Sequence, residues 1–456
     1  MKKKIITFVL FVAGLWVVTS CSLSEPKITR TTVNENEQKL FFHLMALGDD
    51  IIAGYQSAAL VEPHQRNDFV ALIARQGETP MFQQPYIHYP GLGSESYAGY
   101  GILELEYLDN PETPKTVIPD PVIKAIPFSD YPNFDPTTNP FVDDSVMLWP
   151  YPYNNLAVPG IYVDDVIHGV SKLRSRSKSG FLDVILRNPL PAPYGYKSAF
   201  EQAKLFQPTL VLCWIGMYDV LSYAMYSAIN PVTEPPTSKE EFAKYFSELM
   251  DSLKATRAAV IAGNIPDILD MPYFNTVSRF VIDTVTNLPA KDENGNPIPL
   301  VGTNEGDLIL LPAKSFIKRG YGLPASFPNS NGEALPDDVV LTPAEQQTVK
   351  DLIDGFNTII DSVCTLRQIP VVDMHGFFKE VSEGYGVAGL TVNAKFITGG
   401  FYSLDGIHPN DLGQALIANE WLNVINNSFR ISVPLVNIIE QASRFAYSDS
   451  LLTGDQ

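Results

Sequence analysis

Short apolar runs alternate with amphipathic segments of helical spacing along most of this chain, and this alternation restricts its fold most strongly. We expect strands at Lys39–Leu47, Pro208–Ile215, Val260–Asn264 and Gln368–Asp373. We expect helices at Asp68–Arg75, Ser238–Ala258, Thr342–Thr365 and Asp411–Asn426. Strands separated by helices predict a parallel sheet with helices on both faces, so the fold class is α/β.

Two long stretches interrupt the alternation. Residues 80–152 are rich in proline, and residues 271–340 are rich in Asn, Gly, Pro and Asp. Loops at the carboxyl ends of the strands form the ligand site of an open α/β sheet. We therefore predict one domain over residues 39–430 whose two insertions cap the site, followed by a C-terminal extension over residues 431–456.

The N-terminus has the features of a targeting signal. Three lysines at 2–4 precede an apolar run at 5–18, which is too short for a bilayer span. Val18-Thr19-Ser20-Cys21 resembles the lipobox of bacterial lipoproteins, although an ordinary signal peptide is the alternative. We predict a signal peptide over 1–20, lipidation of Cys21, a polar tether over 21–38, and anchoring to the inner or outer membrane as an extracytoplasmic cell-envelope protein.

Composition excludes several classes of protein. The chain has 456 residues, 45% of them hydrophobic and 18% charged, so it can bury a substantial core. Its net charge of -19 repels phosphate backbones, so no nucleic-acid partner is expected. Cys213 and Cys364 lie in apolar runs and are predicted to be buried thiols, not a disulfide. Asp373 and His375 have no third ligand in register, so no metal site is predicted.

Four segments carry chemically active residue types directly after apolar runs. They are Gly48-Asp49-Asp50-Ile51-Ile52-Ala53-Gly54, Asn155-Leu156-Ala157-Val158-Pro159-Gly160, Gly216-Met217-Tyr218-Asp219, and Asp405-Gly406-Ile407-His408. Carboxyl ends of parallel strands share one edge of a sheet, so these segments are expected to meet there. We expect Asp49 and Asp219 to bind backbone N–H groups of their loops.

In order and context these four segments resemble the SGNH, or GDSL, hydrolase family of esterases and lipases. The resemblance implies a flavodoxin-like three-layer α/β/α sandwich and hydrolysis of carboxylic esters without a cofactor. It also implies that His408 is the general base and that Asp405 orients it. Gly160 and the residue at position 218 would bind the oxyanion.

This chain departs from the family pattern at two positions. Asp50 stands where the family has its nucleophilic serine, and Tyr218 stands where it has an asparagine of the oxyanion site. An ionised carboxylate has no proton for a histidine to remove, and its charge opposes a developing oxyanion. Asp50 is instead expected to raise the pKa of His408.

Three hypotheses follow from the departures. In the first, the chain is a carboxylic-ester hydrolase with weakened, altered or lost activity toward an acyl ester, a lipid or an acylated glycan, and the alternative to it is a non-catalytic pseudoenzyme that binds such a ligand. Alternatively, Asp50 is itself a nucleophile and His408 activates the hydrolytic water. In the third hypothesis a nearby hydroxyl, Ser57 or Ser403, replaces the missing serine.

Overall fold

The computed structural model describes residues 33–93, 99–106, 122–131, 151–227, 235–283 and 286–443. The expected signal peptide, Cys21 and the first part of the expected tether lie outside these residues. In the described ranges no helix combines the length and the apolar character needed to cross a bilayer.

A parallel sheet forms the centre of the fold, as predicted. Its strands are hydrogen-bonded in the order β1-β6-β7-β10, with bounds Leu44–Gly48, Leu210–Trp214, Ala259–Gly263 and Val371–Val372. Every pairing in this sheet is parallel. Residues 154–158 run parallel to the free edge of β1. The N–H of Ala46 donates to the carbonyl of Asn154, and the N–H of Leu156 donates to the carbonyl of Ala46. With this segment the order is the 2-1-3-4-5 order of flavodoxin-like folds.

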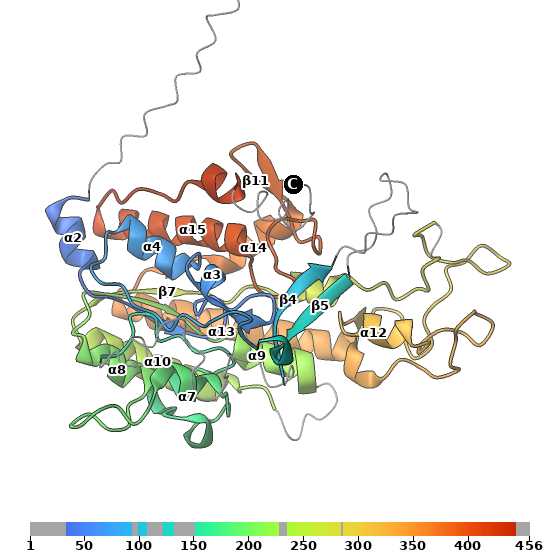
Figure 1. Ribbon diagram of the computed structural model, residues 1–456, viewed down its shortest axis with the longest axis horizontal. Helices are drawn as coiled ribbons and strands as arrows, with labels where there is room; N and C mark the ends of the chain where they lie inside the picture. Colours follow the sequence, from blue (N-terminus) through green and yellow to red (C-terminus); the bar gives the residue numbers. More distant parts are fainter. Residues whose placement is uncertain are drawn as a thin grey trace, which may run out of the picture. The chain divides into compact units, whose positions relative to one another are not determined.

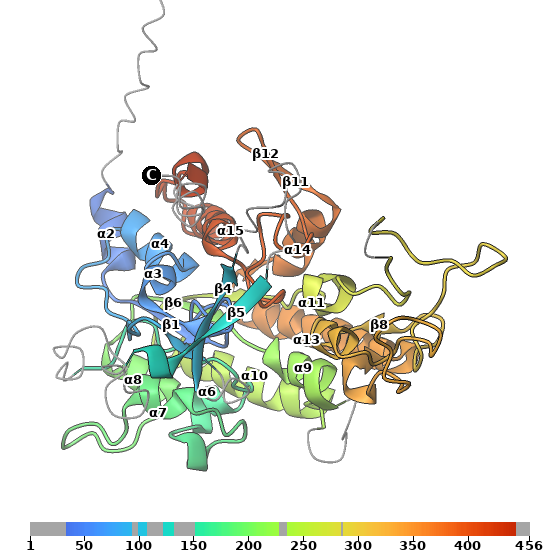
Figure 2. The ribbon, with the colours of Figure 1, turned by 45° about the vertical axis from the view of Figure 1, so that its right-hand side comes forward.

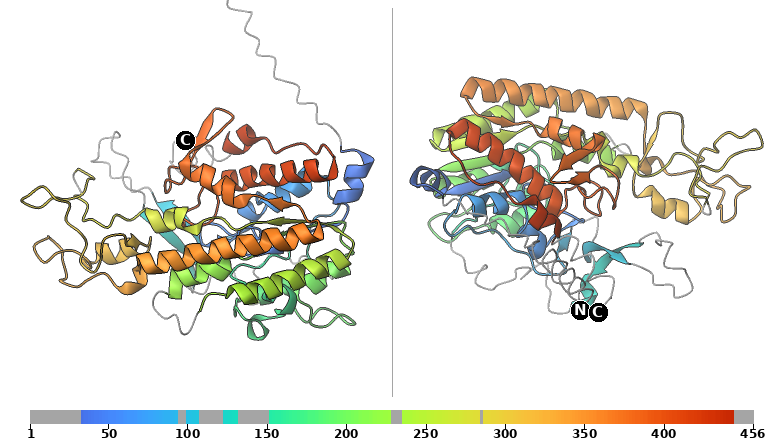
Figure 3. Two further views of the ribbon diagram at one scale, coloured as in Figure 1. Left: turned by 180° about the vertical axis from the view of Figure 1, so that it is seen from behind. Right: turned by 90° about the horizontal axis from the view of Figure 1, so that it is seen from above.

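Helices cover both faces of this sheet (Figures 1 and 3). On one face lie α4, α14 and α15, with bounds Phe69–Gln76, Met374–Glu383 and Asp411–Phe429. On the other lie α8, α10 and α13, with bounds Ala199–Leu205, Lys239–Ala255 and Pro343–Arg367. Capping boxes start two of the expected helices, because Ser238 pairs with Glu241 and Thr342 with Glu345 at the starts of α10 and α13. The fold is therefore the expected α/β/α sandwich.

Shorter helices connect these layers. The α-helices are α3 Glu62–Gln65, α6 Asp165–His168, α7 Phe181–Leu186, α9 Tyr218–Ser222, α11 Pro272–Asn275 and α12 Ala313–Lys318. A π-turn, η4 Tyr223–Ser227, continues α9. The 3-10 turns are η2 Phe128–Asp130, η3 Lys172–Arg174, η5 Ile268–Asp270 and η6 Asp337–Val339.

The first strand begins later than the sequence predicted. Residues Glu35–Phe41 form helix α2, so the strand expected from Lys39 starts only at Leu44. Asn34 caps α2 through a capping box with Glu37. Glu37 is buried and also accepts a hydrogen bond from the backbone N–H of Ser432. The last part of the stretch expected to be a tether is thus ordered against the C-terminal segment.

The insertions add small antiparallel sheets beside the main one. In the first, β4 (Tyr100–Glu106) pairs with β5 (Val122–Pro127), while β3 (Leu92–Gly93) pairs with β2 (Ala59–Leu60). In the second, β8 (Leu308–Ile309) pairs with β9 (Val340–Leu341), and α12 lies beside them (Figure 2). This second insertion has a core of its own, formed by Val281, Leu300, Ile309, Ala313, Leu335, Val339 and Val340. A further antiparallel pair, β11 (Tyr385–Val387) and β12 (Leu390–Val392), precedes the segment that carries Asp405 and His408.

Large aromatic side chains join the sheet to the helices of one face. Trp421 of α15 is fully buried between Phe69 of α4 and Trp214 of β6, with ring centroids 5.4 Å and 6.0 Å away. Cys213 and Cys364 are both buried free thiols, as predicted. This packing fixes the end of β6, from which one of the site segments continues.

Candidate active site

The first segment leaves β1 in a turn that only glycine permits. A Cβ atom on Gly48 would lie 1.9 Å from the carbonyl oxygen of Trp214, which excludes any side chain there. The chain then turns back at once, because the N–H of Ala53 binds the carbonyl of Asp49 and that of Tyr55 binds the carbonyl of Asp50. Asp50 is thereby placed at the carboxyl edge of the sheet.

Asp49 fastens this turn to the third segment. Its Oδ2 lies 3.2 Å from the backbone nitrogen of Gly216 and 3.1 Å from that of Met217, and both N–H groups donate to it. Burial and the charge of Asp50 raise the pKa of Asp49 well above its ordinary value, although the backbone N–H groups of Tyr218 and Gly216 oppose the rise. Asp219 similarly accepts from the N–H of Val163 and the hydroxyl of Thr237. Both carboxylates accept backbone N–H groups as expected, but these N–H groups belong to other segments and not to their own loops.

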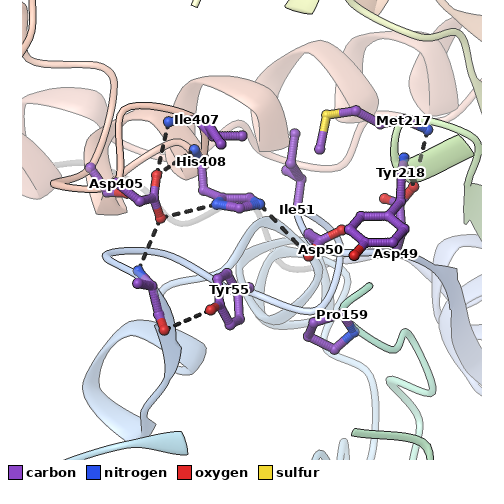
Figure 4. A network of polar contacts seen from close by, with 12 residues as sticks. Asp49, Asp50, Ile51, Tyr55, Pro159, Met217, Tyr218, Asp405, Ile407 and His408 are labelled. Carbon is purple, nitrogen blue, oxygen red and sulfur yellow. Dashed lines mark hydrogen bonds and ion pairs between the residues drawn. The ribbon is translucent and has the colours of Figure 1, made fainter. Parts of the chain in front are cut away.

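Asp405 and His408 form a buried hydrogen-bonded pair. Nδ1 of His408 lies 3.0 Å from Oδ2 of Asp405, and both side chains are less than one-tenth exposed. The other carboxylate oxygen, Oδ1, accepts from the backbone N–H groups of Ile407 and His408, each at 2.9 Å. The three-residue spacing therefore closes a turn in which the carboxylate fixes the imidazole, and Nε2 points away from it (Figure 4).

Asp50 faces the other side of the same imidazole. Its Oδ1 lies 3.8 Å from Nε2 of His408, within the range of an ion pair but too long for a hydrogen bond. Asp50 is 5% exposed and His408 4% exposed. Among the residues that the structure describes, Oδ2 of Asp50 and Nε2 of His408 have no hydrogen-bond partner. The structure thus brings Asp50, His408 and Asp405 into one row, carboxylate–imidazole–carboxylate.

The charges of this row decide its protonation. Burial lowers the pKa of His408, but the neighbouring carboxylates of Asp405, Asp50 and Asp49 outweigh burial and raise that pKa above its ordinary value. Burial opposes ionisation of Asp405 too, yet the charge and hydrogen bonds of His408 bring the pKa of Asp405 below its ordinary value. Burial raises the pKa of Asp50, opposed by the charge of His408 and by the backbone N–H of Gly160. The expected effect of Asp50 on His408 is therefore confirmed in direction.

Tyr218 lies on the Asp50 side of this row (Figure 4). Gly160 lies on the same side, because its backbone N–H faces Asp50. Gly160 has a φ of +73°, a conformation that favours glycine, and a Cβ atom there would lie 3.7 Å from the hydroxyl oxygen of Tyr218. The ring of Tyr218 is 5.5 Å from that of Tyr162. A tyrosine ring thus occupies the neighbourhood in which the family carries an asparagine side chain.

Ser57 and Ser403 do not take the position of a nucleophile. The N–H of Ser57 donates to Oγ of Ser403 at 2.9 Å, and Oγ of Ser57 accepts from the N–H of Leu404. Both serines are buried, and they join the loop after the first segment to the loop that carries Asp405. Their hydrogen bonds hold these two loops together on the Asp405 side of the imidazole, away from Nε2.

Tyr55 is a site residue that the sequence reasoning missed. Its ring meets the His408 ring edge to face, with centroids 5.0 Å apart, and its hydroxyl donates to the carbonyl of Ala58 at 2.6 Å. The N–H of Ala58 in turn donates to Oδ2 of Asp405 at 3.0 Å. This link depends on the left-handed backbone of Ser57 and Ala58, whose φ values are 48° and 61°. No sequence motif predicts that conformation.

The fold is an α/β/α sandwich, and its candidate site is the buried row of Asp50, His408 and Asp405. Residues 127–421 match the family of GDSL-like lipases and acylhydrolases. The chain belongs to this family. No curated protein matches it.

Three solved structures are similar at low sequence identity. LAE5, an α/β hydrolase from the metagenome of Lake Arreo in Spain, is 13% identical, with a TM-score of 0.34 over 84% of this chain and 93% of that one. The acetyl xylan esterase AlAXEase is 11% identical, with a TM-score of 0.29 over 62% and 85% of the two chains. A lipase/acylhydrolase from Enterococcus faecalis is 11% identical, with a TM-score of 0.26 over 64% and 85%.

The arrangement restricts the chemistry that the site supports. A general base must be neutral, whereas His408 lies between two carboxylates that favour its charged form. A serine nucleophile would give a proton to Nε2, but Asp50 in its ionised form has none to give. Ester cleavage by the serine route is therefore not available to the residues in this row.

Proposed function

We propose that this chain is a cell-envelope lipoprotein whose esterase-type site binds an acyl ester, on a lipid or an acylated glycan, without serine-dependent turnover. The single observation that carries the proposal is the separation of 3.8 Å between Asp50 and His408 in a buried row. Oδ1 of Asp50 lies on the Nε2 side of the imidazole, which is the side from which a serine nucleophile would transfer its proton. Family membership supports the ester class of ligand.

The presence of the Asp405–His408 pair supports the proposal that the site keeps the arrangement of an esterase apart from its nucleophile. Both residues keep the geometry of a general base and its orienting carboxylate, with 3.0 Å between Nδ1 and Oδ2. If only the nucleophile is missing, then a serine at position 50 supplies a hydroxyl close to Nε2. The proposal therefore expects activity to be recoverable by one substitution.

The test compares hydrolysis of short and long p-nitrophenyl acyl esters by residues 22–456 and by three variants. The variants are Asp50→Ser, Asp50→Asn and Asp50→Ser combined with His408→Ala. We expect wild type and Asp50→Asn to be silent, Asp50→Ser to exceed them by roughly a hundredfold or more, and the double variant to be silent again. Calorimetric titration of wild type with p-nitrophenyl butyrate measures binding without turnover.

Two results contradict this proposal. Turnover by wild type that is lost in an additional single variant, His408→Ala, means that the site is catalytic as it stands. Absence of both turnover and binding in wild type, with no gain in Asp50→Ser, means that the cleft does not take acyl esters. Matching circular dichroism spectra of the variants exclude misfolding as the cause.

A second candidate is hydrolysis with Asp50 as nucleophile, favoured by its unpartnered and buried Oδ2. In this route Oδ2 attacks the ester carbonyl, the bond to the alkoxide breaks, and an anhydride with the acyl group forms. The alkoxide takes a proton from the imidazolium of His408 and leaves as the alcohol, which makes His408 neutral. Water activated by neutral His408 then hydrolyses the anhydride and restores the carboxylate. Turnover in ¹⁸O-water that places the isotope in Asp50, and that is lost in Asp50→Asn, identifies this route.

A further inference from the structure

A short part of this acidic chain has the opposite charge. Residues 170–204 contain seven basic and two acidic residues, although the whole chain has 32 basic and 51 acidic ones. Four of the seven, Lys172, Arg174, Arg176 and Lys178, fall within seven consecutive positions around η3. The rest of the chain is therefore more negative than its net charge of -19 suggests.

Large apolar side chains are exposed in the same part of the surface. Leu173, between two basic residues, is 84% exposed, and Tyr196 is 48% exposed. We call the set Tyr151, Leu173, Arg174, Lys178, Tyr194 and Tyr196 the basic aromatic surface.

Several members of the basic aromatic surface are joined by contacts in one area. The guanidinium of Arg174 lies 4.9 Å above the ring of Tyr196, and Lys178 donates to the carbonyl of Leu173 at 3.2 Å. Asn188 links its two ends, because its amide donates to the carbonyls of Val170 and Lys197. Next to it, Arg187 donates to the carbonyl of Tyr151 at 2.7 Å.

The acidic residues nearby reduce this charge without cancelling it. Asp165 is 1% exposed and accepts from the backbone N–H groups of Arg176 and Ser177, and Asp164 has a side chain only 15% exposed. Asp183 is exposed and accepts from the backbone N–H of Lys172, and Glu201 pairs with Lys197. Arg174 and Lys178 contact a ring and backbone carbonyls, which leave their charge in place. With seven basic residues against two acidic ones, residues 170–204 keep a net positive charge.

The basic aromatic surface borders the candidate site. Its basic run ends at Ser179, whose hydroxyl donates to the carbonyl of Pro159 at 2.6 Å. Pro159 directly precedes Gly160 of the second segment. Whatever binds this surface is therefore brought next to the Asp50–His408 row.

We propose that the basic aromatic surface docks on an anionic lipid bilayer. Screening limits electrostatic attraction to about 8 Å at physiological ionic strength, so the local charge of the approaching face counts more than the net charge. A leucine and tyrosines flanked by Lys and Arg match the interfacial zone, where apolar side chains enter below anionic headgroups. An exposed aliphatic side chain such as Leu173 has no partner on an anionic polysaccharide, which favours the bilayer.

This docking is independent of the lipid anchor and of any ester turnover. It is therefore tested on residues 22–456, which carry no acyl chain. All described contacts and all three buried clusters lie within residues 33–443, so residues 22–456 retain the whole described fold.

The experiment is sedimentation with vesicles of phosphatidylcholine alone or mixed with phosphatidylglycerol at about two to one. We expect binding only to the mixed vesicles, and loss of binding as salt is raised. Arg174→Glu with Lys178→Glu should lower the partition coefficient by about tenfold or more, and Leu173→Ser by severalfold. Leu173→Ser changes a highly exposed side chain, so its effect does not depend on refolding.

Matched controls change the same residue types elsewhere. Leu366, in α13, is 80% exposed, and Leu366→Ser should leave binding unchanged. Lys318→Glu with Lys350→Glu carries the same change of net charge on α12 and α13. Equal binding to both kinds of vesicle, or equal losses in surface and control variants, overturns the proposal. Binding to dextran sulfate without binding to vesicles overturns it as well, in favour of an anionic polysaccharide.

Discussion

Replacement of Asp50 by Asn should make His408 easier to deprotonate. The substitution keeps the size of the side chain and removes one negative charge 3.8 Å from Nε2. At an effective dielectric constant of about 20, two unit charges at this distance attract each other by about 4 kcal/mol. This corresponds to an upper bound of about a thousandfold in the protonation equilibrium of the imidazole.

Nuclear magnetic resonance of histidine-labelled protein measures this change. The His408 ring resonance, assigned through His408→Gln, is followed as pH rises in wild type and in Asp50→Asn. The sign is fixed by the charge, because the loss of a neighbouring carboxylate lowers the pKa of a histidine. We expect deprotonation at lower pH in Asp50→Asn, by at least tenfold in proton concentration.

Asp219→Asn is the matched control, since Asp219 is also a fully buried carboxylate but binds Val163 and Thr237 instead. It should leave the His408 titration unchanged. An identical titration in wild type and Asp50→Asn would refute the reasoning, because it would mean that Asp50 is not an ionised neighbour of His408.

Four further measurements examine the fold and the row. The free energy of unfolding of wild type should fall as pH rises from about 6.5 through the raised pKa of folded His408, since the bound proton is favoured only in the folded state, and urea titrations should give a smaller fall in Asp50→Asn. Asp405→Ala should cost about 3 kcal/mol or more at neutral pH, and this loss should shrink as pH falls below about 3.9 through the lowered pKa of folded Asp405, where its carboxylate becomes protonated. Trp421→Ala should cost about 3–5 kcal/mol in urea unfolding, whereas the exposed Leu366→Ala should change stability by about 0.5 kcal/mol at most. Thr342→Ala should cost about 1 kcal/mol by removing the cap of α13, measured by thermal unfolding.

Contradictory results are equally specific for these variants. Stability of wild type that rises over the same pH range would reverse the assigned proton linkage. A pH-independent cost of Asp405→Ala would mean that its charge does not contribute. Equal losses in Trp421→Ala and Leu366→Ala would place Trp421 outside the core.

Long helices with local start signals were predictable from the sequence, because their capping residues act within one turn. Ser238 and Thr342 both begin helices as expected. The prediction at the N-terminus was wrong because a local start signal was not taken into account. The apolar residues after Lys39 favour a strand, but the capping box of Asn34 and Glu37, in the polar stretch before them, starts a helix.

The candidate site was predictable only where its parts are close in the chain. The spacing of Asp405 and His408 already implies a turn that joins them, and their hydrogen bond is present. The distance from Asp50 to His408 depends on how the loop after β1 packs against the loop before α15, and these two residues are 358 positions apart in the chain. Tyr55 acts through the left-handed backbone of Ala58, and nothing in residue type alone predicts that conformation.

The carboxylate at position 50 also affects how such a protein is detected. Fluorophosphonate probes label serine hydrolases by reacting with an activated serine hydroxyl, and Asp50 offers no hydroxyl. Chemical proteomics based on these probes would leave this chain out of a census of its own family. Its Asp50→Ser variant, in contrast, would be labelled if the row can activate a hydroxyl, so labelling gives a readout that needs no knowledge of the natural ligand.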